Sequence, residues 1–233
     1  HEIAAFIVEP LVQGAAGMQL RPAEEFAALG RACTNHGVLL VCDEVATGFG
    51  RTGALFASEL CRLAPNLMCL GKGITGGYLP MAATAADERV YSAFLGEDLG
   101  ERTLYHGHSY SGNALAAAVG LRHLELFDDW AVLDNVNERS QQLASLLAEH
   151  VSTLAEVGVV RQQGLMAGIE LAPPPGASRW GRRVSAGCVQ RGVLIRPLGD
   201  VVVAMPILTS TAEEIERVVA VVAESIADVG ARG

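Results

Sequence analysis

Short apolar runs alternate with amphipathic segments along the first part of the chain. Residues 4–8 and 38–42 are apolar runs typical of buried strands, and residues 22–36 between them repeat apolar positions with a helical period. Residues 79–85 form a further strand-like run. Strand, helix and strand in succession are the signature of a parallel sheet, so this pattern predicts an α/β fold with flanking helices.

The pattern changes near residues 115–130, inside or after a long Ala- and Leu-rich helix expected at 113–127. Helices and strands then alternate without a parallel-sheet pattern. The expected elements lie at 132–154, 159–163, 165–171, 178–191, 193–196, 201–205 and 212–229. We therefore expect a second, α+β module after the first.

Composition and charge narrow the class of protein. Half of the residues are hydrophobic and the net charge is −9, which favours extensive burial and argues against a nucleic-acid partner. No apolar run approaches the roughly 20 residues that span a bilayer. The five cysteines are odd in number and lack Cys-x-x-Cys spacing, as in ordinary cytoplasmic proteins. We expect a cytoplasmic protein without a membrane or nucleic-acid partner, in a chain that starts within a fold.

Lysine occurs once in the sequence, at position 72, whereas arginine occurs sixteen times. A surface cation can be arginine, but a nucleophilic amine cannot, because guanidinium stays protonated. Lys72 follows an apolar run and is flanked by Gly71 and Gly73, which allow close approach of backbone or a planar ligand. The alternative interpretation is an ordinary lysine in a turn.

Two chemistry-bearing residues follow strand-like runs. Asp43 comes after the run at 38–42, and Lys72 comes after the run at 67–70. Ligands of parallel sheets gather at the carboxyl ends of strands, so both residues are expected at that edge. The glycines at 48–53 fit Gly-x-Gly-x-x-Gly, but the acidic residues before them would repel a pyrophosphate. A Walker A pattern also fails around Lys72.

The segment before the helix expected at 113 contains candidate anion and metal ligands. His106 and His108 have spacing two, but no third ligand accompanies them, so a metal site is disfavoured. Ser109, Ser111 and Asn113 open the helix, where backbone N–H groups and hydroxyls suit a phosphate.

Pyridoxal phosphate would use all of these groups. Its aldehyde needs a lysine (Lys72), its ring nitrogen a carboxylate (Asp43), and its phosphate donors such as Ser109. Arg196, at the end of a strand in the second module, is a candidate for binding a substrate carboxylate. The alternative for Arg196 is a structural surface residue.

Three motifs together resemble a known family. They are Ile7-Val8-Glu9-Pro10 with Gln13-Gly14, the run from Asp43 to Gly53, and Gly71-Lys72-Gly73. They resemble the class III pyridoxal-phosphate aminotransferases of fold type I, over essentially the whole chain. The resemblance implies part of a large cofactor-binding domain over residues 1–120 and a smaller α+β domain over residues 121–233.

The resemblance also implies roles for individual residues. Lys72 matches the lysine that holds the cofactor, Asp43 the partner of the ring nitrogen, and Val45 the residue packed on a ring face. His108 and Ser109 match a phosphate contact supplied by a neighbouring subunit. Substrate-binding roles fall to Gly107 and Arg196. The family implies a homodimer with shared active sites that takes a small-molecule amino donor and a keto acid acceptor.

Narrower motifs resemble the members of this family that act in biotin synthesis. These motifs are Lys72 to Pro80, His106 to Asn113 and Ile195 to Gly199. The implied amino donor is S-adenosylmethionine or lysine. Family chains begin well before His1, so this chain resembles their C-terminal part and lacks several pocket residues. The alternatives are another class III enzyme acting on an ω-amino acid or amine, and a truncated fragment without catalytic activity.

Overall fold

A computed structural model describes residues 2–177 and 179–231 of the chain. The chain forms two compact units, and each draws on separate stretches of sequence. The first unit comprises residues 1–11, 21–49 and 56–131, and the second comprises residues 12–20, 50–55 and 132–233.

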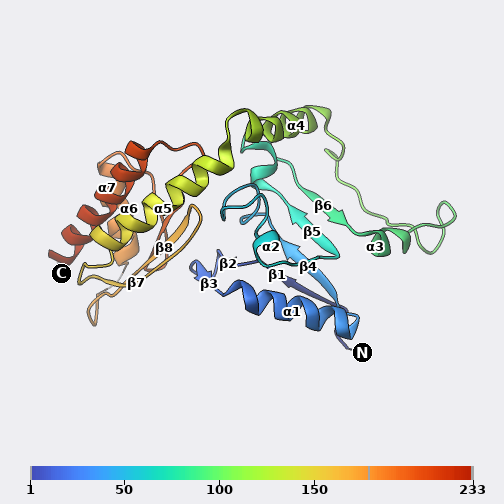
Figure 1. The fold of residues 1–233 in the computed structure, drawn as a ribbon, viewed down its shortest axis with the longest axis horizontal. Helices are drawn as coiled ribbons and strands as arrows, with labels where there is room; N and C mark the ends of the chain where they lie inside the picture. The colour runs from blue at the N-terminus through green and yellow to red at the C-terminus, as the bar shows by residue number, and fades with distance from the viewer. Residues whose placement is uncertain (1, 178, 232–233) are drawn as a thin grey trace. The chain divides into compact units, whose positions relative to one another are not determined.

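The first unit is built on a four-stranded sheet in the order β1-β4-β5-β6 (Figure 1). Strands β1, β4 and β5 are parallel, and β6 is antiparallel to β5. Its elements are β1 (Ala5–Val8), α1 (Ala23–His36), β4 (Leu39–Asp43), α2 (Ala57–Leu60), β5 (Leu67–Leu70), the 3₁₀ helix η1 (Lys72–Thr75), β6 (Ala83–Ala86), α3 (Glu88–Ser92) and α4 (Ala114–Asp129).

Helix α1 covers one face of this sheet. Buried Cys33 of the helix packs with Leu40 and Cys42 of β4, and partly buried Val8 and Leu29 surround them. The helix ends because Gly37 adopts φ 68° and turns the chain into β4, a conformation that suits glycine. Side chains alternate along a strand, so Ile7, Val41 and Asp43 belong to the opposite face of the sheet.

The second unit contains an antiparallel sheet in the order β7-β8-β10-β9. Helices α5 and α6 both pack against α7, and α6 also contacts β9 and β10. The elements of this unit are β2 (Val12–Gln13), β3 (Gln19–Leu20), α5 (Val132–His150), β7 (Val157–Gln163), β8 (Met166–Leu171), α6 (Trp180–Gln190), β9 (Arg196–Leu198), β10 (Val201–Ala204) and α7 (Ala212–Ala231).

Two short stretches from early in the chain belong to this second unit. The Arg161 side chain donates to the carbonyls of Gly17 and Met18, both at 3.0 Å, and so holds the β2–β3 hairpin. Gln163 Nε2 donates to the carbonyl of Thr52 at 2.8 Å, and Arg51 donates to the carbonyl of Pro206. Residues 48–53 form turns and begin no helix, so the glycines here do not open the helix that a dinucleotide-binding motif requires.

The expected α/β character and most expected elements are confirmed, and four differ in their bounds. The helix expected at 132–154 ends at His150. The strand expected at 79–85 begins only at Ala83, after Pro80, which lacks the N–H that a ladder needs. The strand expected at 193–196 is displaced to Arg196–Leu198, although the hairpin around Gly199 is present. The helix expected from 178 begins at Trp180, and Ser178 lies outside the described residues.

Among the described residues, none of the helices combines the length and apolar character that crossing a bilayer requires.

Candidate active site

Asp43 and Lys72 lie at the same edge of the first sheet. Asp43 is the last residue of β4, and Lys72 follows the end of β5 by two residues. The two strands are parallel neighbours, with Asp43 opposite Cys69. Their carboxyl ends therefore meet at one edge, as predicted from the two apolar runs.

Val45 connects these two residues. Its backbone N–H donates to Asp43 Oδ1 at 3.0 Å, which fixes the orientation of that carboxylate. A Cβ on Gly71 would lie 3.3 Å from Val45 Cγ1, so the backbone before Lys72 packs directly on the Val45 side chain. Asp43, Val45 and Lys72 thus form one local cluster, which we call the β4–β5 edge site.

The turn that carries Lys72 is tight, and its side chain is exposed. Lys72 has φ 40°, in the left-handed region, where a residue with a side chain stores on the order of 1–3 kcal/mol of strain. A Cβ on Gly73 would lie 2.8 Å from Phe49 Cβ, so only glycine fits after the lysine. The packing of this turn presents the lysine amine to solvent.

His123 of α4 packs behind the same turn, and the sequence did not single it out. A Cβ on Gly76 would lie 2.8 Å from His123 Cδ2. The His123 ring lies 5.1 Å from the Phe127 ring and 6.3 Å from the Phe49 ring, centroid to centroid. Its Nδ1 is buried without a hydrogen-bond partner among the described residues, and burial lowers the pKa of the imidazole. His123 is therefore a neutral packing residue at neutral pH.

The cysteine thiols near the edge site, buried at Cys42 and Cys61 and partly buried at Cys69, are not nucleophiles. Burial and, to a lesser extent, the Glu44 carboxylate raise the pKa of Cys42 to about 12 and that of Cys61 to about 11. Burial, followed by the Asp43 carboxylate, raises the pKa of Cys69. All three thiols are protonated at neutral pH, which leaves Lys72 as the candidate nucleophile predicted from the sequence.

The segment with Gly107, His108 and Ser109 is exposed, and its described hydrogen bonds stay within the loop. The His108 N–H donates to Ser111 Oγ at 3.2 Å. Helix α4 begins at Ala114, and Asn113 Oδ1 already accepts the N–H groups of its first turn. Ser109 therefore lies outside the helix start expected to hold a phosphate, and any phosphate here would use the loop.

Arg196 begins β9, the edge strand of the second unit, where it pairs with Val203. Its side chain is exposed, which leaves the guanidinium accessible to a ligand. Its role as a carboxylate-binding residue stays a prediction, as do the roles of the β4–β5 edge site and of residues 107–109.

The residues of the edge site fit one end of pyridoxal phosphate. A carboxylate, an apolar side chain and a primary amine match its ring nitrogen, ring face and carbonyl. The close approach of Gly71 to Val45 and of Gly73 to Phe49 leaves the amine as the protruding group of the turn.

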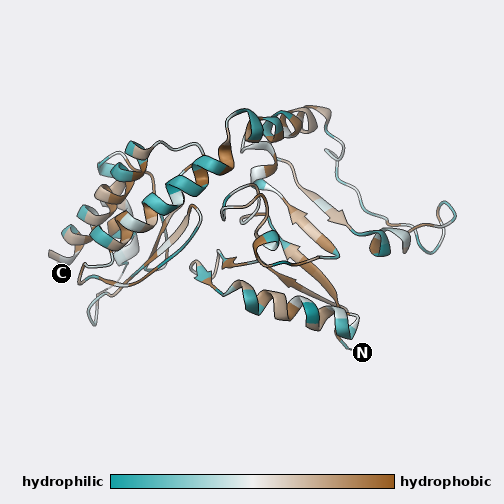
Figure 2. Ribbon diagram, in the orientation of Figure 1, coloured by the Kyte–Doolittle hydropathy of each residue, from teal (hydrophilic) through white to brown (hydrophobic). Residues whose placement is uncertain are grey.

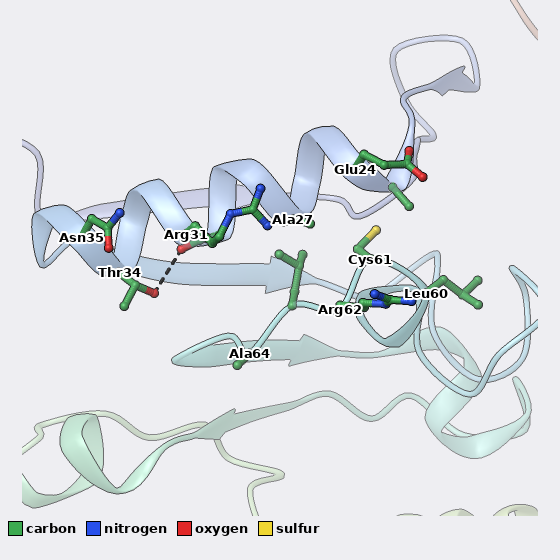
Figure 3. A pocket seen from close by; sticks show the side chains of 12 residues that line it. Glu24, Ala27, Arg31, Thr34, Asn35, Leu60, Cys61, Arg62 and Ala64 are labelled. Atoms are coloured by element: carbon green, nitrogen blue, oxygen red, sulfur yellow. Dashed lines mark hydrogen bonds between the residues drawn. The ribbon is translucent and has the colours of Figure 1, made fainter.

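A separate hollow of about 630 Å³ lies between α1 and residues 60–64 (Figure 3). It is lined by Ala23, Glu24, Ala27, Gly30, Arg31, Thr34, Asn35, Leu60, Cys61, Arg62, Leu63 and Ala64. None of the candidate site residues lines it, so its size does not make it the site of the chemistry. Within residues 2–177 and 179–231, no group of three or more His, Cys, Asp or Glu side chains could hold a metal ion.

Comparison with known proteins identifies the family. The Aminotransferase class-III family matches residues 1–226. Adenosylmethionine-8-amino-7-oxononanoate aminotransferases from Nitratidesulfovibrio vulgaris and Anoxybacillus flavithermus are similar at 46% and 43% identity. The alignments cover 100% and 97% of this chain but 44% and 51% of those proteins. The chain thus spans about half the length of the curated relatives it matches.

Solved structures agree with the sequence comparison. The crystal structure of adenosylmethionine-8-amino-7-oxononanoate aminotransferase from Methanocaldococcus jannaschii is similar with a TM-score of 0.90 at 38% identity, over 95% of this chain and 53% of that one. A PLP-bound amine transaminase from an uncultivated Pseudomonas species has a TM-score of 0.90 at 36% identity, over 98% of this chain and 53% of that one. The resemblance noted in the sequence motifs is confirmed, and the chain belongs to the class III aminotransferases.

Proposed function

We propose that the complete protein transfers an amino group to 8-amino-7-oxononanoate, giving 7,8-diaminononanoate in biotin biosynthesis, with S-adenosylmethionine or lysine as amino donor. The observation that carries the chemistry is the placement of Asp43, Val45 and Lys72 at one strand edge. The choice of substrate is supported by the names of relatives at 46% and 43% identity and by the motif Ile195 to Gly199.

Lys72 has two tasks in this proposal. Pyridoxal phosphate, when bound, supplies an electron sink beside the substrate carbon. The Nζ atom of Lys72 would hold the cofactor through its carbonyl, and as a free amine it would accept and return a proton at the substrate carbon. An exposed amine on a rigid turn suits both tasks, because it is accessible and its backbone stays in place.

Asp43 and Val45 set the environment of the cofactor ring. An opposite charge close to a basic nitrogen raises the pKa of that nitrogen, so the Asp43 carboxylate favours its protonated form. The Val45 N–H orients that carboxylate, and the Val45 side chain offers an apolar surface for one ring face. Together they would hold the ring beside Lys72 and shield one of its faces from water.

The remaining contacts come from exposed segments. We propose that His108 and Ser109 serve the phosphate of the cofactor bound by a neighbouring subunit of a homodimer, with Gly107 beside the substrate path. The exposure of this loop supports that role, since its side chains are not buried within their own unit and can contact another subunit. Arg196 binds the carboxylate of the keto acid, where its planar guanidinium can donate two hydrogen bonds.

Cofactor fixation tests the central assignment. The complete protein is mixed with pyridoxal phosphate, reduced with borohydride and mapped by peptide mass spectrometry. The cofactor is expected on the peptide that contains Lys72. Attachment at no residue, or equal attachment to Lys72→Ala, would remove the lysine from its role.

A second candidate function is transamination of an ω-amino acid or amine. An omega-aminotransferase from Caulobacter vibrioides is 38% identical over 93% of this chain and 49% of that protein. Steady-state assays with 8-amino-7-oxononanoate and with simple ω-amino acids distinguish the two. A kcat/KM larger for the ω-amino acids would favour this second function and leave the role of Lys72 unchanged.

A further inference from the structure

Glu44 follows Asp43 directly, and its side chain is completely buried. A buried carboxylate is costly unless hydrogen-bond donors or a cation compensate its charge. None of the ion pairs found in the described part of the chain includes Glu44. The Glu44 charge also acts on the thiols of Cys42 and Cys61, but both thiols are protonated and therefore uncharged at neutral pH. The compensation therefore comes from neutral donors.

Three neutral groups donate to this carboxylate. Thr47 Oγ1 donates to Glu44 Oε2 at 2.6 Å, and the Ala57 N–H donates to the same oxygen at 3.2 Å. The Ser58 N–H donates to Oε1 at 2.7 Å. Ala57 and Ser58 open α2, whose N-cap residue Phe56 makes no side-chain cap. Glu44 thus satisfies the start of α2 from another part of the chain.

The main chain around Glu44 is held as firmly as its side chain. The Glu44 N–H donates to the carbonyl of Cys69 on β5 at 2.9 Å, and the Glu44 carbonyl accepts the Gly48 N–H at 2.9 Å. A Cβ on Gly48 would lie 2.7 Å from that carbonyl oxygen. The segment from Asp43 to Gly48 is therefore one tight turn, with the Glu44 carboxylate as its anchor to α2.

This turn carries both residues that set the cofactor ring. The Asp43 carboxylate takes its orientation from the Val45 N–H, and Val45 packs on Gly71 beside Lys72. A shift in the backbone at Glu44 would move both partners of the ring at once. Glu44 itself is fully buried with its oxygens occupied by three donors, so it does not touch the substrate.

We propose that Glu44 is a positioning residue, whose buried carboxylate holds Asp43 and Val45 in place against the Lys72 turn. The proposal rests on the proposed function, in which Asp43 serves the ring nitrogen. It adds a residue that acts through Asp43 and Val45 and not through contact with cofactor or substrate.

The test is Glu44→Gln in the complete protein, which keeps the side-chain volume but replaces one acceptor oxygen by a donor that faces N–H or O–H groups. In the cofactor-free protein, hydrogen exchange at the Val45 amide is expected to accelerate by about 10-fold, as for the loss of a hydrogen bond to a charged group. Amides of residues 39–42 should keep their exchange rates.

With pyridoxal phosphate labelled with ¹⁵N in the ring, the Glu44→Gln signal is expected to move toward that of an unprotonated ring nitrogen. The dissociation constant of the cofactor should rise by about 10-fold. The matched control is Leu29→Ala, which loosens the α1 face of the same sheet and lowers stability without touching the turn. It should leave the ring-nitrogen signal unchanged.

A Glu44→Gln protein that is less stable but keeps the Val45 exchange rate and the ring-nitrogen signal of the unsubstituted protein would overturn the proposal. Should Glu44→Gln fail to fold, Thr47→Val removes one donor to the carboxylate and is expected to shift both readouts in the same direction; no shift would overturn it equally. Failure of the unsubstituted protein to attach cofactor at Lys72 refutes the proposed function instead. The exchange measurement then still decides whether Glu44 holds the turn.

Discussion

Strand β8 of the second unit is buried along nearly its whole length, whereas strand β1 of the first unit exposes three of its four residues. Met166 and Ile169 of β8 are almost completely excluded from solvent, while Ile7 of β1 is 63% exposed. Both strands are apolar (Figure 2). The difference therefore lies in what covers them and not in their sequences.

The two sheets explain this contrast. The antiparallel sheet of the second unit is packed by helices from its own unit. In the first unit, Ile7, Val41 and Leu67 lie side by side on the face opposite α1, and Ala86 continues the row. Parallel strands ordinarily have both faces covered. The second unit thus has a core covered by its own helices, and the first unit carries the candidate residues of the β4–β5 edge site on an incompletely covered sheet.

Replacing Lys72 tests whether a residue of the first unit can be essential for activity and yet contribute nothing to stability. In the complete protein, Lys72→Ala should lower kcat by at least about 1000-fold, because the amine proposed to move the proton is lost. The midpoint of urea unfolding should stay the same or rise slightly, since the side chain is exposed. Steady-state assays and urea titrations check both. Lys72→Arg is the control that keeps the charge, and activity retained by it would contradict a role for the amine.

Truncating an apolar side chain should cost far more unfolding free energy in the second unit than on the exposed sheet face of the first. Ile169→Ala removes a fully buried side chain and is expected to reduce the free energy of unfolding by about 2–5 kcal/mol. Ile7→Ala should cost no more than about 0.5 kcal/mol in the 233-residue chain, where the residue is exposed. Urea unfolding followed by circular dichroism measures both. A cost of several kcal/mol for Ile7→Ala in the complete protein would show that this face is covered there.

Arg196 is the residue through which the second unit would bind the carboxylate of the substrate. Arg196→Ala in the complete protein should lower kcat/KM for the keto acid by about 10- to 100-fold, the loss expected for hydrogen bonds between charged groups. Exposed Arg182 of α6 offers a matched control, and Arg182→Ala should leave kcat/KM unchanged. Equal kinetics for the two variants would confine the second unit to a structural role.

Local sequence patterns predicted most of the helices and strands. The apolar runs before Asp43 and Lys72 predicted β4 and β5, and parallel pairing then placed both residues at one edge, whereas the strand order was not predicted. The two-residue strands β2 and β3 were missed because so short a pair has no periodicity and depends on Arg161, about 140 residues further along the chain. His123 was missed for a similar reason, since it packs on Phe49 and Gly76, which lie much earlier in the chain. Glu44 was missed because the donors to its carboxylate, Thr47, Ala57 and Ser58, form no periodic pattern in the sequence.

His123 should make the first unit sensitive to acid. Burial lowers the pKa of its imidazole below the usual 6.5, so the unfolded state binds this proton more readily than the folded state. The neutral His123 imidazole makes its full contribution to stability above about pH 6.5, and this contribution is lost as the pH falls below that value toward the lowered pKa of the folded state. Urea midpoints at pH 7.5 and 5.5 should therefore differ more in the unsubstituted protein than in His123→Phe.

Ile169→Ala provides the control for this effect, because it lowers stability without removing a titratable group. Its urea midpoints should fall at both pH values, and the difference between them should stay as it is in the unsubstituted protein. A difference that narrows as much in Ile169→Ala as in His123→Phe would mean that lower stability, and not the loss of the imidazole behind Lys72, explains the change.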